Sequence, residues 1–243
     1  MFYLTTQSPL AAGPDGFPRR EGRAYLPGAA LREALLAAAL AYAIRRDEAF
    51  AAEMRRLAQH AFKGSAGELA DAMTAALLER QPELAALAPD DAFVDEPSER
   101  TVMWMDTWKG EPVREQRLEL VEGRFPVGRS LPPELETWLA AAGRSYAEAL
   151  ATAELEALGG TLPSLAEFYH ELKARQFKGA SWPLRLGYWT PEPEGGRFLA
   201  FARLAAASRA LERRFQARPL PRHLLYEPAS GRTLGWAVLE KEG

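Results

Sequence analysis

The chain has 243 residues, of which 47% are hydrophobic and 26% charged, and its formal net charge is −3 with a sequence pI near 5.8. This is the composition of a globular protein with enough length for a sizeable core. The absence of cysteine excludes disulfides, thiolate metal sites and cysteine nucleophiles. No apolar run is long enough to span a bilayer and no signal peptide is recognisable, so we expect a cytoplasmic protein.

The first half of the chain predicts a strand followed by helices. Residues 2–10 begin with a β-prone stretch, a Gly- and Pro-rich loop follows, and residues 23–26 form a second short extended segment before the Pro27-Gly28 turn. Apolar residues then recur at three- and four-residue spacing, which is typical of helices. We expect these helices over residues 29–46, 48–62 and 68–80.

The second half predicts two hairpins separated by helices. Alternating and β-branched residues around a Lys109–Pro112 turn indicate a hairpin, and a second hairpin is expected over the last twenty residues around Ser230-Gly231. Between them we expect helices over residues 131–158, 165–177 and 198–214, and an aromatic loop over residues 179–189. Strands at both ends around helices and a hairpin predict an α+β fold whose sheet is closed by the two termini.

The Pro27-Gly28 turn places an arginine in the first turn of a helix. Arg32 lies at the helix end where a positive charge is unfavourable, so its position needs a reason. One reason is a salt bridge to Glu33 or to a neighbouring strand, and the other is a nearby anion such as a phosphate. Gly28 would let another backbone approach closely.

Charge is unevenly distributed along the chain. The acidic pI does not favour nucleic-acid binding, and the excess of arginine over lysine is also what a GC-rich genome produces. However, arginine is the better residue for bidentate phosphate contacts and for stacking. Basic clusters at Arg19-Arg20, Arg213-Arg214 and Arg218–Arg222 stand apart from the acidic stretch 89–96, which is compatible with a local basic groove.

The usual catalytic motifs are missing. The sequence has no Walker-type loop, GxGxxG, HExxH or GxSxG motif, so nucleotide hydrolysis, dinucleotide binding, zinc proteolysis and α/β-hydrolase chemistry have no support. His60, His170 and His223 do not pair at metal-ligand spacing. We therefore expect no catalytic residues, no metal and no cofactor.

Three segments are informative when taken together: Gln7–Gly13, Tyr25–Arg32, and Leu184–Gly187 with Leu234-Gly235-Trp236. In order, they are similar to the first strand and its glycine turn, to the Pro-Gly element that leads a strand into a helix, and to the late glycine loop and terminal strand of one family. That family is the RAMP proteins (Cas7/Csm-like) of type III CRISPR effector complexes, which the chain resembles. Within that family the chain looks most like the Csm subunit that caps the crRNA 3′ end. Ala29 and Ala30 replace the usual serines and Glu33 the usual glycine, so the chain resembles a short, diverged member.

The resemblance implies a ferredoxin-like (RRM-like) RAMP core forming a single domain over residues 1–243, with helical insertions at roughly 29–88 and 131–176. It further implies a non-catalytic crRNA-binding subunit of a type III effector complex in antiviral defence, whose partners are crRNA, target RNA and other effector subunits, with no membrane. Single-stranded RNA recognition of this kind uses a sheet, aromatic stacking and arginines on phosphates.

The resemblance also assigns candidate RNA-binding residues. Pro27, Gly28 and Arg32 carry over from the second motif, and Arg185 and Gly187 from the third. Contacts to the RNA phosphate backbone are expected from five cations, and stacking of an RNA base from one of two aromatic residues. The cations are Arg19, Arg20, Arg32, Lys178 and Arg185, and the aromatic residues are Tyr188 and Trp189, for which core packing is the competing interpretation.

Two other functions stay open at this point. One is a RAMP-type endoribonuclease that processes precursor crRNA with His60 or His170 as the base. The other is a helical protein–protein adaptor, which the acidic pI and the alanine-rich helices favour.

Overall fold

The computed structural model describes residues 1–61, 65–128, 133–174, 181–190, 197–205 and 218–242. The strands are β1 (Phe2–Thr6), β2 (Arg19–Arg20), β3 (Arg23–Leu26), β4 (Ala92–Phe93), β5 (Ser98–Asp106), β6 (Glu111–Leu120), β7 (Arg124–Val127), β8 (Trp182–Arg185), β9 (His223–Glu227), β10 (Arg232–Thr233) and β11 (Trp236–Lys241). The helices are α1 (Gly28–Arg46), α2 (Glu48–Arg56), a π-helical turn η1 (Leu57–Ala61), α3 (Ala66–Arg80), a 3-10 turn η2 (Pro82–Ala86), α4 (Pro133–Leu158), α5 (Pro163–Ala174) and α6 (Phe198–Ala205).

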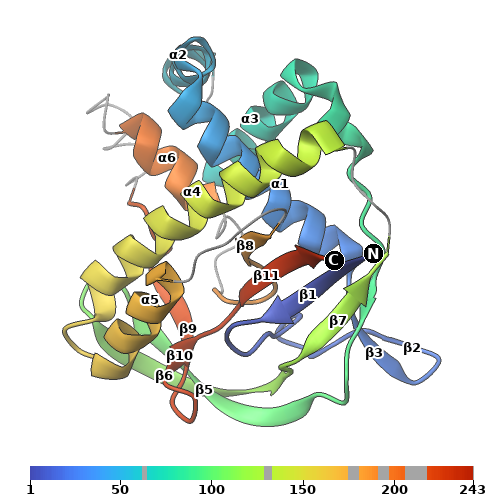
Figure 1. Ribbon diagram of the computed structural model, residues 1–243. Coiled ribbons are helices and arrows are strands. Elements are labelled where there is room, and N and C mark those ends of the chain that lie inside the picture. The colour runs from blue at the N-terminus through green and yellow to red at the C-terminus, as the bar shows by residue number, and fades with distance from the viewer. Residues whose placement is uncertain (62–64, 129–132, 175–180, 191–196, 206–217, 243) are drawn as a thin grey trace.

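The first sheet joins the two ends of the chain. Its order is β7-β1-β11-β8 and all its pairings are antiparallel. The central pair aligns Leu4 with Leu239, so both termini lie together at one end of the sheet (Figure 1). The predicted closure of the sheet by the termini is therefore confirmed.

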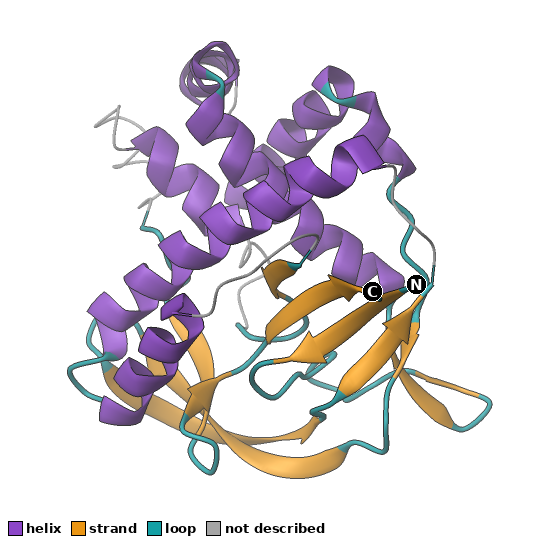
Figure 2. Cartoon of the chain, viewed as in Figure 1, coloured by secondary structure: helices purple, strands orange, loops and turns teal. Residues whose placement is uncertain are grey.

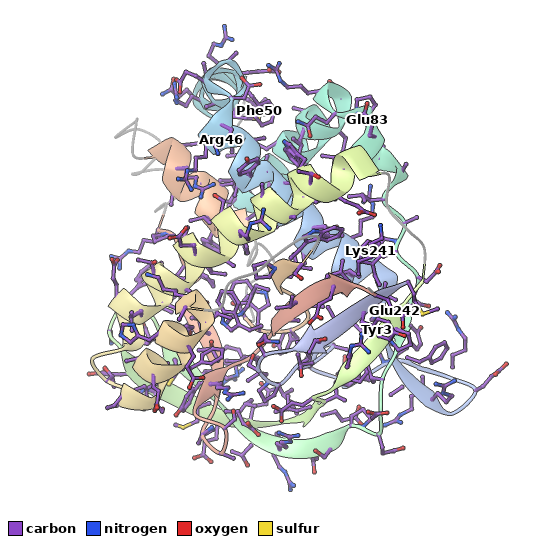
Figure 3. All side chains as sticks on the ribbon, viewed as in Figure 1. Tyr3, Arg46, Phe50, Glu83, Lys241 and Glu242 are labelled. Atoms are coloured by element: carbon purple, nitrogen blue, oxygen red, sulfur yellow. The ribbon has the colours of Figure 1, made fainter. Side chains whose placement is uncertain are left out.

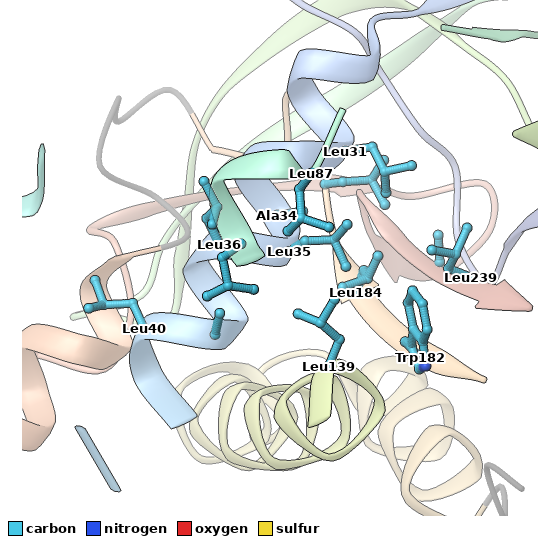
Figure 4. Close-up of a cluster of buried hydrophobic side chains, with 14 of the residues drawn as sticks. Leu31, Ala34, Leu35, Leu36, Leu40, Leu87, Leu139, Trp182, Leu184 and Leu239 are labelled. Carbon is cyan, nitrogen blue, oxygen red and sulfur yellow. The ribbon is translucent and has the colours of Figure 1, made fainter. Parts of the chain in front are cut away.

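The main hydrophobic core lies between this sheet and helices α1 and α4. Alternation along the strands sends Leu4, Leu184 and Leu239 to the helix side, where all three are buried. The helix side is supplied by the leucines of α1, which recur at the spacing of one helical face, and by Leu139 of α4 (Figure 4). The periodicity visible in the sequence thus corresponds to real burial.

A second sheet has the order β10-β9-β5-β6 and is dominated by the long β5–β6 hairpin. It packs with α5 and the C-terminal part of α4 around a second core that contains Val102, Tyr146 and Trp236 (Figure 2). The short strands β2, β3 and β4 form a third small sheet. Mixed helices and antiparallel sheets confirm the predicted α+β class.

Two sequence-based expectations about strands are wrong. Residues 182–185 lie in the predicted aromatic loop but form the fully buried strand β8, which accommodates Pro183 because β8 is an edge strand. The predicted terminal hairpin is wrong in its extent: β9 and β10 do pair around the Ser230-Gly231 turn, but β11 leaves the hairpin and pairs with β1 and β8. The turn at Leu234-Gly235, where Gly235 has φ +90°, carries the chain from one sheet to the other.

The helices fall into two blocks, residues 28–86 and 133–174, with α6 added later. That these blocks are insertions into one domain stays a prediction. Among the described residues, no helix combines the length and apolar character needed to cross a bilayer.

Candidate nucleic-acid interface

The N-terminus of α1 is occupied by a carboxylate of the same chain. The backbone N–H of Gly28 donates to Asp91 Oδ1 over 2.9 Å, which places a negative charge at the positive end of the helix dipole. Gly28 is buried, and a Cβ there would lie 2.0 Å from the carbonyl oxygen of Pro89. The expected close backbone approach is confirmed, but it comes from the 89–91 loop. This contradicts a direct contact of Gly28 with RNA, because its only donor is already used.

The structure also explains Arg32. Its Nε donates to the backbone carbonyl of Leu87 over 2.9 Å, so the arginine ties the first turn of α1 to the segment after η2. The predicted salt bridge to Glu33 is not formed, since Glu33 pairs instead with Arg197, and Asp91 rather than an external anion caps the helix terminus. Pro27 is the N-cap residue, with the extended backbone (φ −60°, ψ 135°) that starts the helix. RNA contacts of Pro27 and the half-buried Arg32 stay predictions.

Arg19 and Arg20 form β2 and are exposed, as a backbone-contacting role requires. Arg19 Nη2 lies 2.8 Å from Glu119 Oε1, and Arg20 Nη2 lies 2.8 Å from Asp91 Oδ2. These ion pairs between partly exposed side chains are weak in water, so they do not prevent the guanidinium groups from contacting another anion. Asp91 thus links β2 to the N-terminus of α1, because one of its carboxylate oxygens binds Arg20 and the other binds the N–H of Gly28.

One face of the β2–β3–β4 sheet carries an alternation of cations and aromatic rings, which we call the β2–β4 surface: Arg20, Arg23, Tyr25 and Phe93. In the register, Arg20 is opposite Arg23 and Tyr25 is opposite Phe93, so all four project from the same face. The Arg20 guanidinium lies 5.0 Å from the Tyr25 ring and that of Arg23 lies 4.5 Å from the Phe93 ring. The two ring centroids are 6.0 Å apart.

Three of these four residues are not among the RNA-binding candidates expected from the sequence. Arg23 and Tyr25 share a face of a short strand, and that two-residue spacing was the available signal. Phe93 stands inside the acidic stretch 89–96, where nothing in the sequence indicates that it packs beside a cation. The sheet pairing alone brings it there.

A second cation–aromatic pair lies on the neighbouring sheet. Tyr3 alternates with the buried Phe2 and Leu4 and therefore points away from the helices. The exposed Arg124 of β7 lies 3.6 Å from the Tyr3 ring centroid, and the Tyr3 hydroxyl donates to Glu242 over 3.2 Å (Figure 3). Because β7 packs against β4, the strands that carry this pair lie next to the β2–β3–β4 sheet.

Arg185, in contrast, belongs to the core. Its side chain is fully buried and its Nη1 lies 2.6 Å from Glu154 Oε1, which is equally buried. The guanidinium carbon lies 4.6 Å from the Trp189 ring and 4.7 Å from the Trp236 ring. The predicted phosphate contact of Arg185 is therefore wrong, because no solvent-accessible donor remains.

Glu154 is the centre of this buried cluster. Its second oxygen accepts hydrogen bonds from the hydroxyls of Tyr169 and Thr233. Burial and the adjacent Glu154 carboxylate raise the pKa of Tyr169 well above its ordinary value, so Tyr169 remains a neutral donor. The cluster joins α4, α5, β8 and β10 around one ion pair.

Gly187 and Trp189, which follow β8, also have packing roles. Gly187 has φ +73°, and a Cβ there would lie 2.3 Å from the carbonyl oxygen of Ala11, with which the Tyr188 N–H forms a 2.7 Å hydrogen bond. Trp189 is 3% exposed within the second core, so a stacking platform at Trp189 is wrong. Tyr188 is half-buried and its role in stacking stays a prediction. Lys178 lies outside the described residues.

The two histidines whose side chains are described, His170 and His223, lie in different environments. His170 is exposed on α5, and His223 packs against Trp104 with ring centroids 5.7 Å apart. The side chain of His60 is not among those described. In the described part of the chain, no group of three or more His, Asp or Glu side chains is arranged to hold a metal ion.

Comparison with known proteins identifies the fold. No family model matches the sequence. An uncharacterized protein of Aquifex aeolicus strain VF5 is 25% identical over 245 residues, which cover 98% of this chain and 99% of that protein. One chain in the cryo-EM structure of a Csm–crRNA–target RNA ternary complex of a type III-A CRISPR–Cas system superposes with a TM-score of 0.60 and 18% identity, covering 92% of this chain and 74% of that one.

The crystal structure of Csm5 from T. onnurineus is also similar, with a TM-score of 0.55 and 18% identity over 91% of this chain and 73% of that one. Both neighbours match nearly the whole described fold, the helical blocks included. The chain therefore has the α+β fold of the Csm subunits of type III CRISPR complexes.

Proposed function

We propose that this chain is a non-catalytic, cytoplasmic RNA-binding subunit of a type III CRISPR effector complex, assembled on crRNA with other subunits and with target RNA. The observation that carries the proposal is the fold shared over 92% of the chain with a protein of a Csm–crRNA–target RNA complex. Since a fold by itself does not establish a function, the surface has to supply the recognition chemistry.

The β2–β4 surface suits a single strand of RNA. Arginines can contact successive phosphates, while rings such as Tyr25 and Phe93 offer faces on which unpaired bases stack. Within the described part of the chain, Arg23 and Arg124 form no ion pair with a carboxylate, so their charges are available to phosphates. This local excess is compatible with a net charge of −3, because the field near one face is set by the residues on it.

The proposal predicts salt-dependent binding that depends on this surface. Affinity of the full-length protein for a fluorescent, unstructured RNA is measured by anisotropy between about 50 and 200 mM salt. In the double variant Arg20→Gln/Arg23→Gln, the slope of log affinity against log salt should become less negative by about 1.4, because each phosphate contact to a single strand contributes about −0.7 to the slope. The same variant, expressed with the other subunits, should co-purify with less crRNA.

The matched control is Arg56→Gln, an exposed arginine of α2 on the opposite side of the molecule (Figure 1). It should leave the slope unchanged. If the wild-type protein binds no RNA and its complexes contain none, the proposed function is wrong. If binding is strong but insensitive to Arg20 and Arg23, the function stands and the assignment of the β2–β4 surface fails.

A further inference from the structure

The turn of the β5–β6 hairpin presents an exposed tryptophan between arginines. Trp108 is 39% exposed, and its ring centroid lies 4.4 Å from the Arg218 guanidinium carbon and 5.1 Å from that of Arg222. Both arginines are exposed, so the group lies at the protein surface. Sequence analysis identified Arg218–Arg222 as a basic cluster without an aromatic partner, because Trp108 is more than a hundred residues away.

The turn is held rigidly in place. The Asp106 carboxylate accepts hydrogen bonds from the backbone N–H groups of Trp108 (2.9 Å) and Lys109 (3.2 Å). Thr107 binds the segment that carries the arginines, through its N–H to the Arg222 carbonyl and its hydroxyl to the Pro221 carbonyl, both over 2.8 Å. Trp108 and Arg222 are thus placed together by the backbone, and little ordering remains to be done when a ligand binds.

The charges around Trp108 are not balanced locally. Two guanidinium groups share one indole, and Arg222 alone reaches a carboxylate, with Nε 3.3 Å from Asp106 Oδ2. Within the described residues Arg218 forms no ion pair, and Lys109 adds a further exposed cation. A guanidinium held against a ring face directs its N–H donors sideways in its own plane, and phosphate oxygens are the acceptors that suit this geometry.

A second aromatic residue lies along the same hairpin. Trp104 is half-buried, carries the exposed Arg114 at 3.5 Å from its ring centroid, and donates its indole N–H to Gln116 over 2.9 Å. The arginine and tryptophan residues therefore continue from the turn along β5 and β6. Repeated rings beside cations are the pattern that binds single-stranded nucleic acid without reading its sequence.

We propose that Trp108, Arg218 and Arg222 form a second binding site for single-stranded RNA, with a base stacked on Trp108 and the neighbouring phosphates held by the two arginines. This inference rests on the proposed RNA-binding function. β5 has nine residues, which at about 3.3 Å each separate the turn from the β2–β4 end of the hairpin by about 30 Å. A single strand long enough to bridge that distance would contact both surfaces at once.

The test compares RNAs of two lengths, about 4 and about 16 nucleotides, binding to the full-length protein. Trp108→Ala should weaken binding of the long RNA by roughly five- to a hundredfold, because one stacked base is lost. Trp108→Phe, which keeps an aromatic face, should recover most of this loss. Arg218→Gln should make the slope of log affinity against log salt less negative by about 0.7. The short RNA, which reaches one surface only, should respond less than the long one.

Val113→Ala is the control, because Val113 is 54% exposed on the same hairpin and belongs to neither surface. Unchanged RNA affinity in both Trp108→Ala and Arg218→Gln overturns the proposal, and loss of other subunits from the Trp108→Ala complex would then show that the turn binds protein. If Arg20→Gln/Arg23→Gln weakens binding but the Trp108 variants do not, the proposed function survives and the second site fails. A wild-type protein that binds no RNA removes both.

Discussion

Arginine stacks on aromatic rings in two regions of this molecule that differ in what surrounds the guanidinium group. On the β2–β4 surface, Arg20 and Arg23 stack on rings while part of each cation faces water. Arg185 is instead fully buried beside the Trp189 and Trp236 rings, and among the described residues Glu154 is the carboxylate that pairs with it.

The difference lies in the energetic cost of each charge. An exposed cation keeps its hydration and gains about 0.5 to 1 kcal/mol from an aromatic face. A buried cation has lost its hydration, so its counter-ion is indispensable. Nε and Nη2 of Arg185 have no hydrogen-bond partner in the described part of the chain, and the electron-rich faces of the two indoles lie against the guanidinium instead. The same residue types therefore serve binding in one region and architecture in the other.

The sharpest test of this contrast removes the buried arginine. Arg185→Met leaves the Glu154 carboxylate buried without its cation and should lower the free energy of unfolding by about 3 to 5 kcal/mol, measured by urea denaturation. Adding Glu154→Gln removes the stranded charge and keeps an acceptor for Tyr169 and Thr233, so the double variant should regain much of the loss. Equal losses in the single and double variants would show that the charge of Glu154 is not what Arg185 offsets.

Each region is adjacent to a glycine with positive φ, Gly187 near Arg185 and Gly22 in the β2–β3 turn, and the effects of replacing these two glycines by alanine can be compared. Gly187→Ala imposes a Cβ at φ +73° and 2.3 Å from the Ala11 carbonyl oxygen, so strain and collision act together. Unfolding measurements should show a loss of at least about 1 to 3 kcal/mol, the range for strain alone. Gly22→Ala, in the β2–β3 turn at φ +79° with no atom within 4 Å of the added Cβ, should show the strain without the collision and lose less. Equal losses would contradict the packing role of Gly187.

The smallest effect on the free energy of unfolding is expected on the β2–β4 surface. Arg23→Met removes an exposed guanidinium that lies 4.5 Å from the Phe93 ring. The free energy of unfolding should change by no more than about 1 kcal/mol, whereas RNA affinity should fall with a reduced salt slope. A stability loss as large as that of Arg185→Met would mean that the β2–β4 surface is part of the architecture.

Local patterns in the sequence were sufficient for most elements. The leucines of α1 and the alternation in β5 and β6 give the correct element types, because side-chain period reports which face of an element is buried. The pattern failed at β8, where a three-residue apolar run containing Pro183 is too short to distinguish strand from loop. It failed again at the C-terminal strands, because two strands adjacent in sequence enter different sheets.

Among the candidate site residues, Arg19 and Arg20 are exposed where the sequence suggested a binding role. Gly28, Arg185 and Trp189 have structural roles instead. Gly28 binds Asp91, and Arg185 contacts Glu154 and Trp236, all of which come from distant parts of the chain. No local pattern indicates such pairings.

The sequence by itself determined the α+β class and the helical blocks, because these follow from periodicity and turn chemistry within short windows. Only the tertiary structure decided which arginines face solvent. Burial depends on which segments fold over a side chain, and for Arg20, Arg185 and Arg218 those segments lie roughly thirty to more than a hundred residues away. An arginine beside an aromatic ring is therefore a candidate RNA contact only where the fold leaves it exposed to water.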